Sequence, residues 1–292
     1  MSRTLDRLLR SYVAAPPGFP PVDFSAPQGA PALFAPDSVT WRVMKNPVAL
    51  MVGGVAAVIL ELAEPRVRTG VWEHTSFRRD PVMRIRRTGY AAWVTIYAPA
   101  EAARAMIAGV TRAHDRVAGA TPAGAAYQAN EQELLDWVQA TASYGFVEAY
   151  RRFVRPLSAA EIDRFYAESQ SGAELYGALG APRSAAQLEA LFAAMAPKLK
   201  RSAIVFEFLD IMRAAPLLPS RALQNLVIRA AVEITPTWAR DTLGLDQRYR
   251  LPPSGVALLK PVGAVADKVM LESAPPAQAC VRLGLPPDHL YR

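Results

Sequence analysis

The fold class is decided by residues 130–145, which have the sequence NEQELLDWVQATASYG. Apolar or small residues recur in this stretch at intervals of three and four: Leu134, Val138, Thr141 and Gly145. This is the period of an α-helix that turns one face toward a core. Asn130, followed three residues later by Glu133, is typical of a capping pair at a helix start. The stretch therefore predicts a long amphipathic helix.

The same reasoning extends along most of the 292-residue chain. Two more capping pairs precede apolar residues at helical spacing: Ser158 with Glu161, and Ser184 with Gln187. Further helices are expected near 101–118, 200–213 and 220–233, with proline residues marking the breaks after several of them. Residues 91–97 are the one candidate strand, but they are few and lack a partner, so we expect a helix or an extended piece. The sequence predicts an all-α fold.

The most apolar run covers residues 47–60, PVALMVGGVAAVIL, and ends at Glu61. It is shorter than the roughly 20 residues that a membrane span needs, so it predicts a buried core helix and no transmembrane segment. Each glycine of the Gly53-Gly54 pair costs about 1 kcal/mol inside a helix. Two explanations remain open: a flat or bulky group packs against the pair, or another helix does.

Proline-rich segments divide the chain. Residues 1–37 form an arm without the apolar core of a signal peptide. Residues 38–250 are expected to be one multi-helix domain, and residues 251–292 a proline-rich extension packed on it. A single cysteine, Cys280, excludes an intramolecular disulfide and a cysteine-based zinc cluster, so we expect a reducing, cytoplasmic location.

The charge pattern argues against nucleic acid as a partner. Lys and Arg outnumber Asp and Glu by 33 to 26, which gives a net charge of +7. The excess is mostly arginine scattered through apolar helices, whereas nucleic-acid binders more often carry lysine runs with interleaved aromatic residues.

His114 is the histidine most suited to a functional role. With Ile107, Val110 and Val117 it lies on the apolar stripe of the helix expected near 101–118, which Gly119 would close. Two interpretations stay open: a core histidine with a hydrogen-bond partner, or a ligand of a metal or haem iron. Of the other two histidines, His74 lacks a nearby second zinc ligand, and His289 is assigned no role.

Residues 77–88, FRRDPVMRIRRT, concentrate positive charge beside this candidate. Arg84, Arg87 and Thr88 share one helical face, and apolar residues lie between them. The segment is either a solvated basic face or a site for a buried anion such as the haem propionates, which guanidinium groups bind well. No phosphate-binding loop, G-x-S-x-G or H-E-x-x-H motif occurs, so we expect a cofactor to carry the chemistry.

An ordered set of motifs between residues 40 and 175, with weaker similarity to about 245, resembles the MpaB-type oxygenases and latex-clearing proteins (rubber oxygenases). The motifs are Trp41 with Gly53-Gly54, Glu64-Pro65-Arg66-Val67, Gly70-Val71, His74-Thr75-Ser76-Phe77, Asp80-Pro81, Arg84-x-x-Arg87-Thr88, His114-x-x-Val117-x-Gly119, Tyr127-x-Ala129, Leu134-Leu135-x-Trp137-Val138-x-Ala140-Thr141, Tyr150-x-x-Phe153 and Pro156-Leu157-Ser158.

The resemblance implies a globin-like core that holds haem b, with His114 as the proximal iron ligand and with Arg84 and Thr88 near the distal side. Arg87 stands where the rubber oxygenases carry a lysine that can approach the iron. Since arginine has no free lone pair, a lysine-capped iron is excluded. Gln139 and Glu64 stand where many relatives have histidine.

The resemblance also implies the function: a haem b-dependent oxygenase that uses dioxygen to oxidise a hydrophobic small molecule. Cleavage of an alkene or isoprenoid double bond is one candidate reaction. The expected metal ligand is His114, and Arg84, Arg87 and Thr88 are expected to bind the cofactor and to act in catalysis. Two alternatives are a non-catalytic protein that binds haem or a hydrophobic ligand, and a peripheral membrane protein whose arginines bind anionic lipid.

Overall fold

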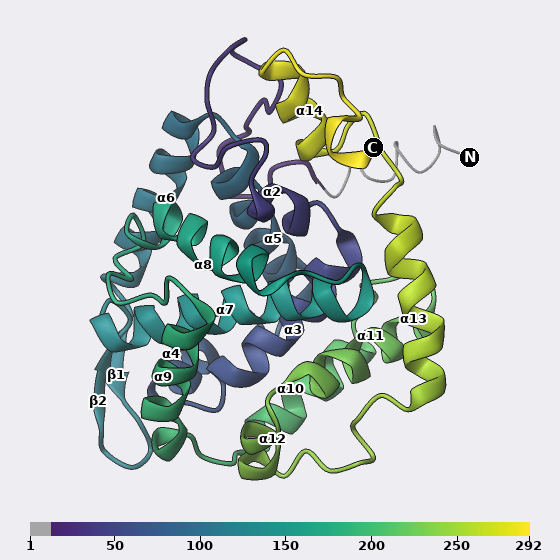
Figure 1. The fold of residues 1–292 in the computed structure, drawn as a ribbon. Helices are drawn as coiled ribbons and strands as arrows, with labels where there is room; N and C mark the ends of the chain where they lie inside the picture. Colours follow the sequence, from purple (N-terminus) through teal and green to yellow (C-terminus); the bar gives the residue numbers. More distant parts are fainter. Residues whose placement is uncertain (1–12) are drawn as a thin grey trace.

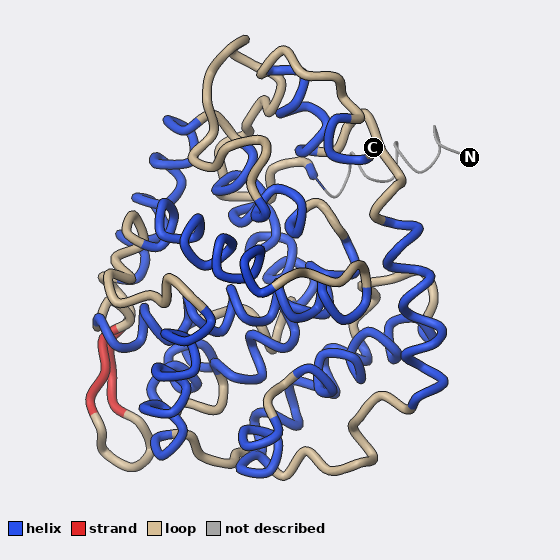
Figure 2. Tube along the Cα trace, in the orientation of Figure 1, coloured by secondary structure: helices blue, strands red, loops and turns tan. Residues whose placement is uncertain are grey.

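The computed structural model describes residues 13–292. Helices make up most of this part of the chain, with one small hairpin (Figures 1 and 2). The all-α prediction is confirmed, whereas a globin-like core stays a prediction. The elements in chain order are α2 (Val39–Met44), α3 (Pro47–Glu61), α4 (Pro65–His74), α5 (Pro81–Tyr97), α6 (Ala100–His114), β1 (Ala118–Ala120), β2 (Ala126–Gln128), α7 (Gln132–Phe153), α8 (Ala159–Ala173), α9 (Ala185–Met195), η1 (Ala196–Lys198), α10 (Ala203–Ala214), α11 (Arg221–Ile234), α12 (Thr237–Leu243), α13 (Pro253–Ala266), α14 (Pro275–Arg282) and η2 (His289–Tyr291).

Two of the three predicted helix starts are confirmed. The Ser158 side chain accepts from the Glu161 backbone N–H, and the Glu161 carboxylate accepts from the Ser158 N–H, so α8 begins with a full capping box. Ser184 likewise accepts from the backbone N–H of Gln187 at the start of α9. These hydroxyl caps satisfy backbone donors that would otherwise lack partners.

The prediction that Asn130 caps α7 is wrong. The helix starts one residue later, with Glu131 at the N-cap position. The Asn130 amide instead donates to the backbone carbonyl of Thr111, 3.3 Å away, and to Asp115, 2.5 Å away. This side chain therefore ties the start of α7 to the end of α6.

Near the predicted site, the secondary structure differs in part from the prediction. Residues 91–97 are helical and belong to α5. The helix expected to reach residue 118 stops at His114, and residues 118–128 form the antiparallel β1–β2 hairpin instead. Gly119 does not close α6, because it lies in β1 opposite Tyr127, where a Cβ atom would come within 2.8 Å of the Tyr127 hydroxyl. Gly124 makes the hairpin turn with a φ of 86°.

The crossing of α3 and α7 forms the centre of the molecule (Figure 1). A Cβ atom on Gly53 would lie 2.6 Å from the Gly145 carbonyl oxygen, and one on Gly145 would lie 2.3 Å from the Gly53 carbonyl oxygen. The two backbones touch, so contact with another helix explains Gly53. It does not explain Gly54, whose Cβ would meet nothing closer than Phe146 at 3.9 Å.

The two ends of the described chain meet at Arg282 of α14. Its side chain is fully buried and donates to three backbone carbonyls: Phe24 at 2.6 Å, Ala30 at 2.9 Å and Tyr97 at 2.8 Å. The proline-rich arm therefore packs between α14 and α5, with Phe24 and Phe34 in the core. Residues after 251 pack as α13 against α3 and α7, and as α14 against α5.

Among residues 13–292, no single helix has the length and mean hydropathy of a membrane span. One helix pair, α3 with α4, meets those criteria together, but it bends by 111° between its members.

Candidate functional site

One face of α3 is less completely packed than the rest of this central helix. Met51, Gly54, Val58 and Glu61 recur at intervals of three and four and remain partly accessible, while most other residues of α3 are buried. The extensive contacts of α3 are with α7 and α11, and it has none of comparable extent with α5 or α6. The partly accessible face is the side of α3 that neighbouring helices cover least.

Glu61, the last residue of α3, faces Arg84 of α5. Burial raises the pKa of Glu61 to about 7, and the positive charge of Arg84 partly opposes this effect. Burial also lowers the pKa of Arg84, while Glu61 raises it. A carboxyl group that titrates near neutral pH therefore lies within electrostatic reach of a guanidinium group, with both residues only partly accessible to solvent.

His114, the last residue of α6, completes this cluster from a third helix. Burial lowers its pKa, and the nearby charge of Arg84 lowers it further, whereas contacts with Asn130 and Asp115 act in the opposite direction. The net direction favours the neutral imidazole, which is the form that binds metal. The structure thus brings Glu61, Arg84 and His114 together; we call these three residues the interior cluster.

Asn130 is placed to orient the His114 ring. Its Nδ2 group is held by Thr111 and Asp115, which fixes the amide. Its Oδ1 atom is buried beside the ring, and hydrogen bonding between Asn130 and the ring raises the His114 pKa against the effect of burial. An imidazole N–H donated to this oxygen would leave the other ring nitrogen free, as metal-binding histidines require.

The two other predicted site residues of α5, Thr88 and Arg87, lie apart from each other in the structure. Arg84 donates to the hydroxyl of Thr88, one turn later, and Thr88 donates to the Arg84 carbonyl at 3.0 Å. Thr88 is exposed. Arg87 instead turns toward the N-terminal arm, where its Nη2 donates to the Pro17 carbonyl at 3.2 Å. The buried Nε of Arg87 has no partner in the described part of the chain.

A haem would need an axial ligand from the protein, cations for its propionates and apolar surface for the porphyrin. The iron of a haem is held by the porphyrin and takes one imidazole from the protein, which His114 can supply. Two arginines on α5 can neutralise propionates, although Glu61 already lies beside Arg84. Met51 and Val58 provide apolar surface on the α3 side. Within residues 13–292, no group of three or more His, Cys, Asp and Glu side chains forms a candidate metal site.

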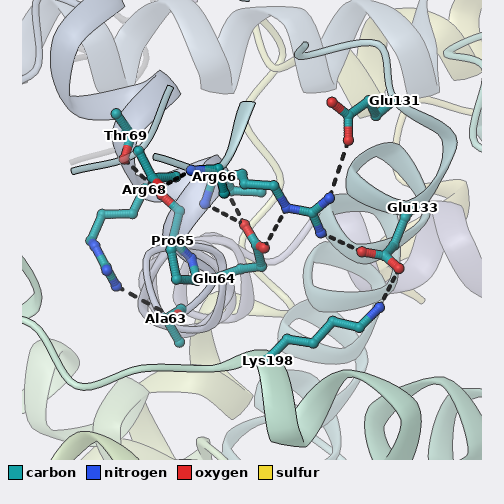
Figure 3. A network of polar contacts seen from close by, with 12 residues as sticks. Ala63, Glu64, Pro65, Arg66, Arg68, Thr69, Glu131, Glu133 and Lys198 are labelled. Atoms are coloured by element: carbon teal, nitrogen blue, oxygen red, sulfur yellow. Dashed lines mark hydrogen bonds and ion pairs between the residues drawn. The ribbon is translucent and has the colours of Figure 1, made fainter. Parts of the chain in front are cut away.

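Glu64 has a structural role (Figure 3). Its carboxylate accepts from the backbone N–H groups of Arg66 and Val67, at 2.7 and 2.8 Å, and so caps α4. It also pairs with the Arg66 side chain at 2.8 Å. Arg66 continues to Glu131 at 3.1 Å and to Glu133, which in turn pairs with Lys198. This network joins α4 to α7 and to the segment after α9.

The remaining candidates lie in ordinary surroundings. His74 is exposed, and its Nε2 atom lies 3.2 Å from the Tyr127 hydroxyl of the hairpin. Gln139 donates to Ser143 on its own helix at 3.2 Å. His289 begins the short helix η2. Neither Glu61 nor the role of Asn130 was predicted from the sequence. For Glu61 the available signal is its position directly after a long apolar run.

Comparison with known proteins gives one match. A family model described as the catalytic domain of ER-bound oxygenase mpaB/B' and rubber oxygenase matches residues 41–287. No curated protein and no solved structure matches the chain. The matched region contains the interior cluster, Asn130, and helices α3 to α14.

Proposed function

Because this chain belongs to the family of mpaB and rubber oxygenase catalytic domains, we propose that it is a haem b-dependent oxygenase that oxidises a hydrophobic small molecule with dioxygen. The observation that carries the proposal is the interior cluster, in which a histidine favoured in its neutral form meets an arginine and a carboxyl group of raised pKa. Perturbed titratable groups in the interior are typical of catalytic sites.

Each member of the interior cluster has a distinct role in this proposal. Haem, when bound, supplies the redox chemistry that activates dioxygen. His114 would hold the iron through one ring nitrogen, and the Asn130 Oδ1 atom would accept a hydrogen bond from the other ring N–H and so fix the ring orientation. Arg84 stabilises negative charge that develops on the reacting oxygen atoms. Glu61, with a pKa of about 7, can accept or release a proton at its carboxylate oxygens under neutral conditions.

In this proposal Arg87 helps to bind the haem, and the apolar face of α3 helps to bind the substrate. The unpartnered Nε of Arg87 supports a role in holding a haem propionate from the side of the N-terminal arm. Met51 and Val58 would exclude water and contact a hydrophobic substrate. An alkene or isoprenoid double bond is the substrate chemistry we propose, by analogy with the rubber-cleaving members of the family.

The absorption spectrum of the freshly purified protein tests the cofactor directly. We expect a Soret band in the wild-type protein and its loss in His114→Ala, with helical content retained because alanine suits a helix. His74→Ala is the matched control, since this histidine is exposed and bonded to Tyr127. An unshifted Soret band in His114→Ala would exclude His114 as the ligand.

Oxygen uptake then distinguishes an oxygenase from a non-catalytic protein that binds haem or a hydrophobic ligand. Consumption of dioxygen that depends on an added hydrophobic alkene supports the oxygenase. A haem-loaded protein that binds such compounds, seen as a spectral shift, but consumes no dioxygen with any of them would instead be a non-catalytic binding protein.

A further inference from the structure

Helix α13 exposes an apolar stripe that the oxygenase site does not use. The stripe consists of four side chains with these exposed fractions: Leu258 61%, Val262 41%, Val265 64% and Val269 46%. Their spacing of four, three and four places them on one side of α13 and of the turn that follows it. Four of the six large apolar side chains that are exposed in residues 13–292 lie in this stripe. Such a concentration marks an interaction surface.

The opposite side of α13 is fixed to the core, so the stripe is not the result of a loosely placed helix. Leu259 is fully buried, and a Cβ atom on Gly263 would lie 2.2 Å from the Phe153 carbonyl oxygen of α7. Asn46 donates to the Gly263 carbonyl at 3.1 Å. Figure 1 shows α13 along the right edge of the molecule, with α3 and α7 on its inner side.

The charges beside the stripe have one sign. Lys260 and Lys268 are exposed. The one acidic residue at this end of the helix, Asp267, turns inward, where it pairs with Lys45 at 2.9 Å and accepts from Asn46 at 3.1 Å. The nearest exposed carboxylate along the chain is Glu272, beyond the stripe. The outer surface of α13 is therefore apolar and positively charged.

An apolar groove continues this surface inward. The groove, with a volume of about 560 Å3, lies between α13, the start of α14, the start of α3 and helix α5. Val262, Val265 and Val269 form one wall, and Leu50 and Trp93 lie on the other side. The stripe and the groove thus form one continuous apolar surface.

We propose that α13 docks this protein on the surface of a bilayer with anionic headgroups. The 14 residues of α13 extend ~21 Å, too short to span a bilayer but suited to lie in its interface. The stripe enters the acyl boundary, while Lys260 and Lys268 meet the lipid phosphates. A second copy of the chain fits less well, because a two-fold contact between stripes would bring lysines near lysines without intervening carboxylates.

Co-sedimentation with vesicles tests the proposal with the full chain. We expect the wild-type protein to bind vesicles of phosphatidylcholine with phosphatidylserine, and to bind phosphatidylcholine vesicles much less. Replacing both Leu258 and Val265 by serine should weaken binding at least about tenfold, because two apolar side chains no longer leave water. Lys260→Gln should weaken it about fivefold, because one positive charge near the lipid phosphates is lost. Leu179→Ser is the matched control, since Leu179 is 64% exposed outside the stripe and its loss should change nothing.

The outcomes that overturn the proposal are equally specific. Wild-type protein that stays in the supernatant with anionic vesicles, or unchanged binding of the Leu258→Ser, Val265→Ser variant, rejects α13 as the docking surface. Equal binding to both vesicle types rejects the anionic lipid. A wild-type dimer in light scattering that the same variant converts to monomer identifies a second copy as the occupant instead. Since none of these measurements needs haem, their failure is distinguishable from failure of the oxygenase proposal.

Discussion

Glu61 shows how the fold changes the chemistry of one carboxyl group. It follows a run of apolar residues, so α3 carries it into the interior, where burial raises its pKa to about 7. Arg84 reduces this shift but does not cancel it. The folded protein therefore holds a proton on Glu61 that the unfolded chain would release above its ordinary pKa.

This shift predicts a pH-dependent effect of Glu61→Gln. Ionised Glu61 costs stability in the folded state, so the stability of the wild-type protein should fall as the pH rises from about 4.5 to about 7. Glutamine removes the cost, which is about 3 kcal/mol at most for a shift of this size. We expect the variant to melt at a higher temperature than wild type at pH 8 and at no higher temperature at pH 4. An equal difference at both pH values would contradict the raised pKa.

Arg84 and Arg87 should differ in what their loss affects. Arg84→Ala should keep haem but slow substrate-dependent oxygen uptake about 100-fold or more, because a charged donor to developing negative charge is removed. Arg87→Ala should chiefly weaken haem binding, since a propionate loses its cation. Haem occupancy and oxygen uptake, measured separately, check both expectations. Wild-type values of both quantities in both variants would show that residues 84–88 are only a basic surface.

The sequence was sufficient to identify some of these residues and not others. His114 and Arg84 could be proposed because charge and helical position are visible locally, and the family resemblance pointed to the same segments. Glu61 could not, because its pKa depends on which helix closes over it. The direction of Arg87 toward the carbonyl of Pro17 depends on how the distant N-terminal arm packs.

At the level of the elements, the crossing of α3 and α7 depends on two glycines that face each other. Gly53→Ala should destabilise the protein by about 1–3 kcal/mol, because the new methyl group would meet the Gly145 backbone at 2.6 Å and backbone cannot move away cheaply. Gly54→Ala is the control on the same helix: with only Phe146 at 3.9 Å, it should stabilise the haem-free protein by up to about 1 kcal/mol. Denaturant unfolding of the three proteins provides the comparison, and equal losses in both variants would contradict this account of the crossing.

Helix boundaries were predictable where local groups decide them. Ser158 and Ser184 bond to backbone groups three residues away, so sequence spacing contains the answer. Asn130 has the same spacing but bonds across to α6, because the hairpin brings the end of α6 beside it. The hairpin itself escaped prediction, since its strands are three residues each and have little β-branched character.

For the whole molecule, Arg282 is the side chain that joins the two ends of the described chain. Arg282→Ala would leave three backbone carbonyls without their donor, each costing about 1–3 kcal/mol where no water replaces it. We expect a lower melting temperature and early protease cleavage between residues 13 and 37 in the variant. The wild-type protein should resist cleavage there, because Phe24 and Phe34 are buried. A variant that resists protease as the wild type does would show that the arm is held by its phenylalanines alone.

The position of Arg282 also has a consequence for local opening. Arg282 of α14 lies 258 residues after Phe24 and 252 residues after Ala30, yet its guanidinium group donates to the carbonyl oxygens of both arm residues. Neither segment can detach without breaking the same bonds, so the two should open as a single cooperative unit. Native-state hydrogen exchange would then give the backbone amides of Gly29 and Leu283 one common opening free energy, with the same dependence on denaturant. Helix α14 and the N-terminal arm would then unfold locally in one step, although they lie at opposite ends of the sequence.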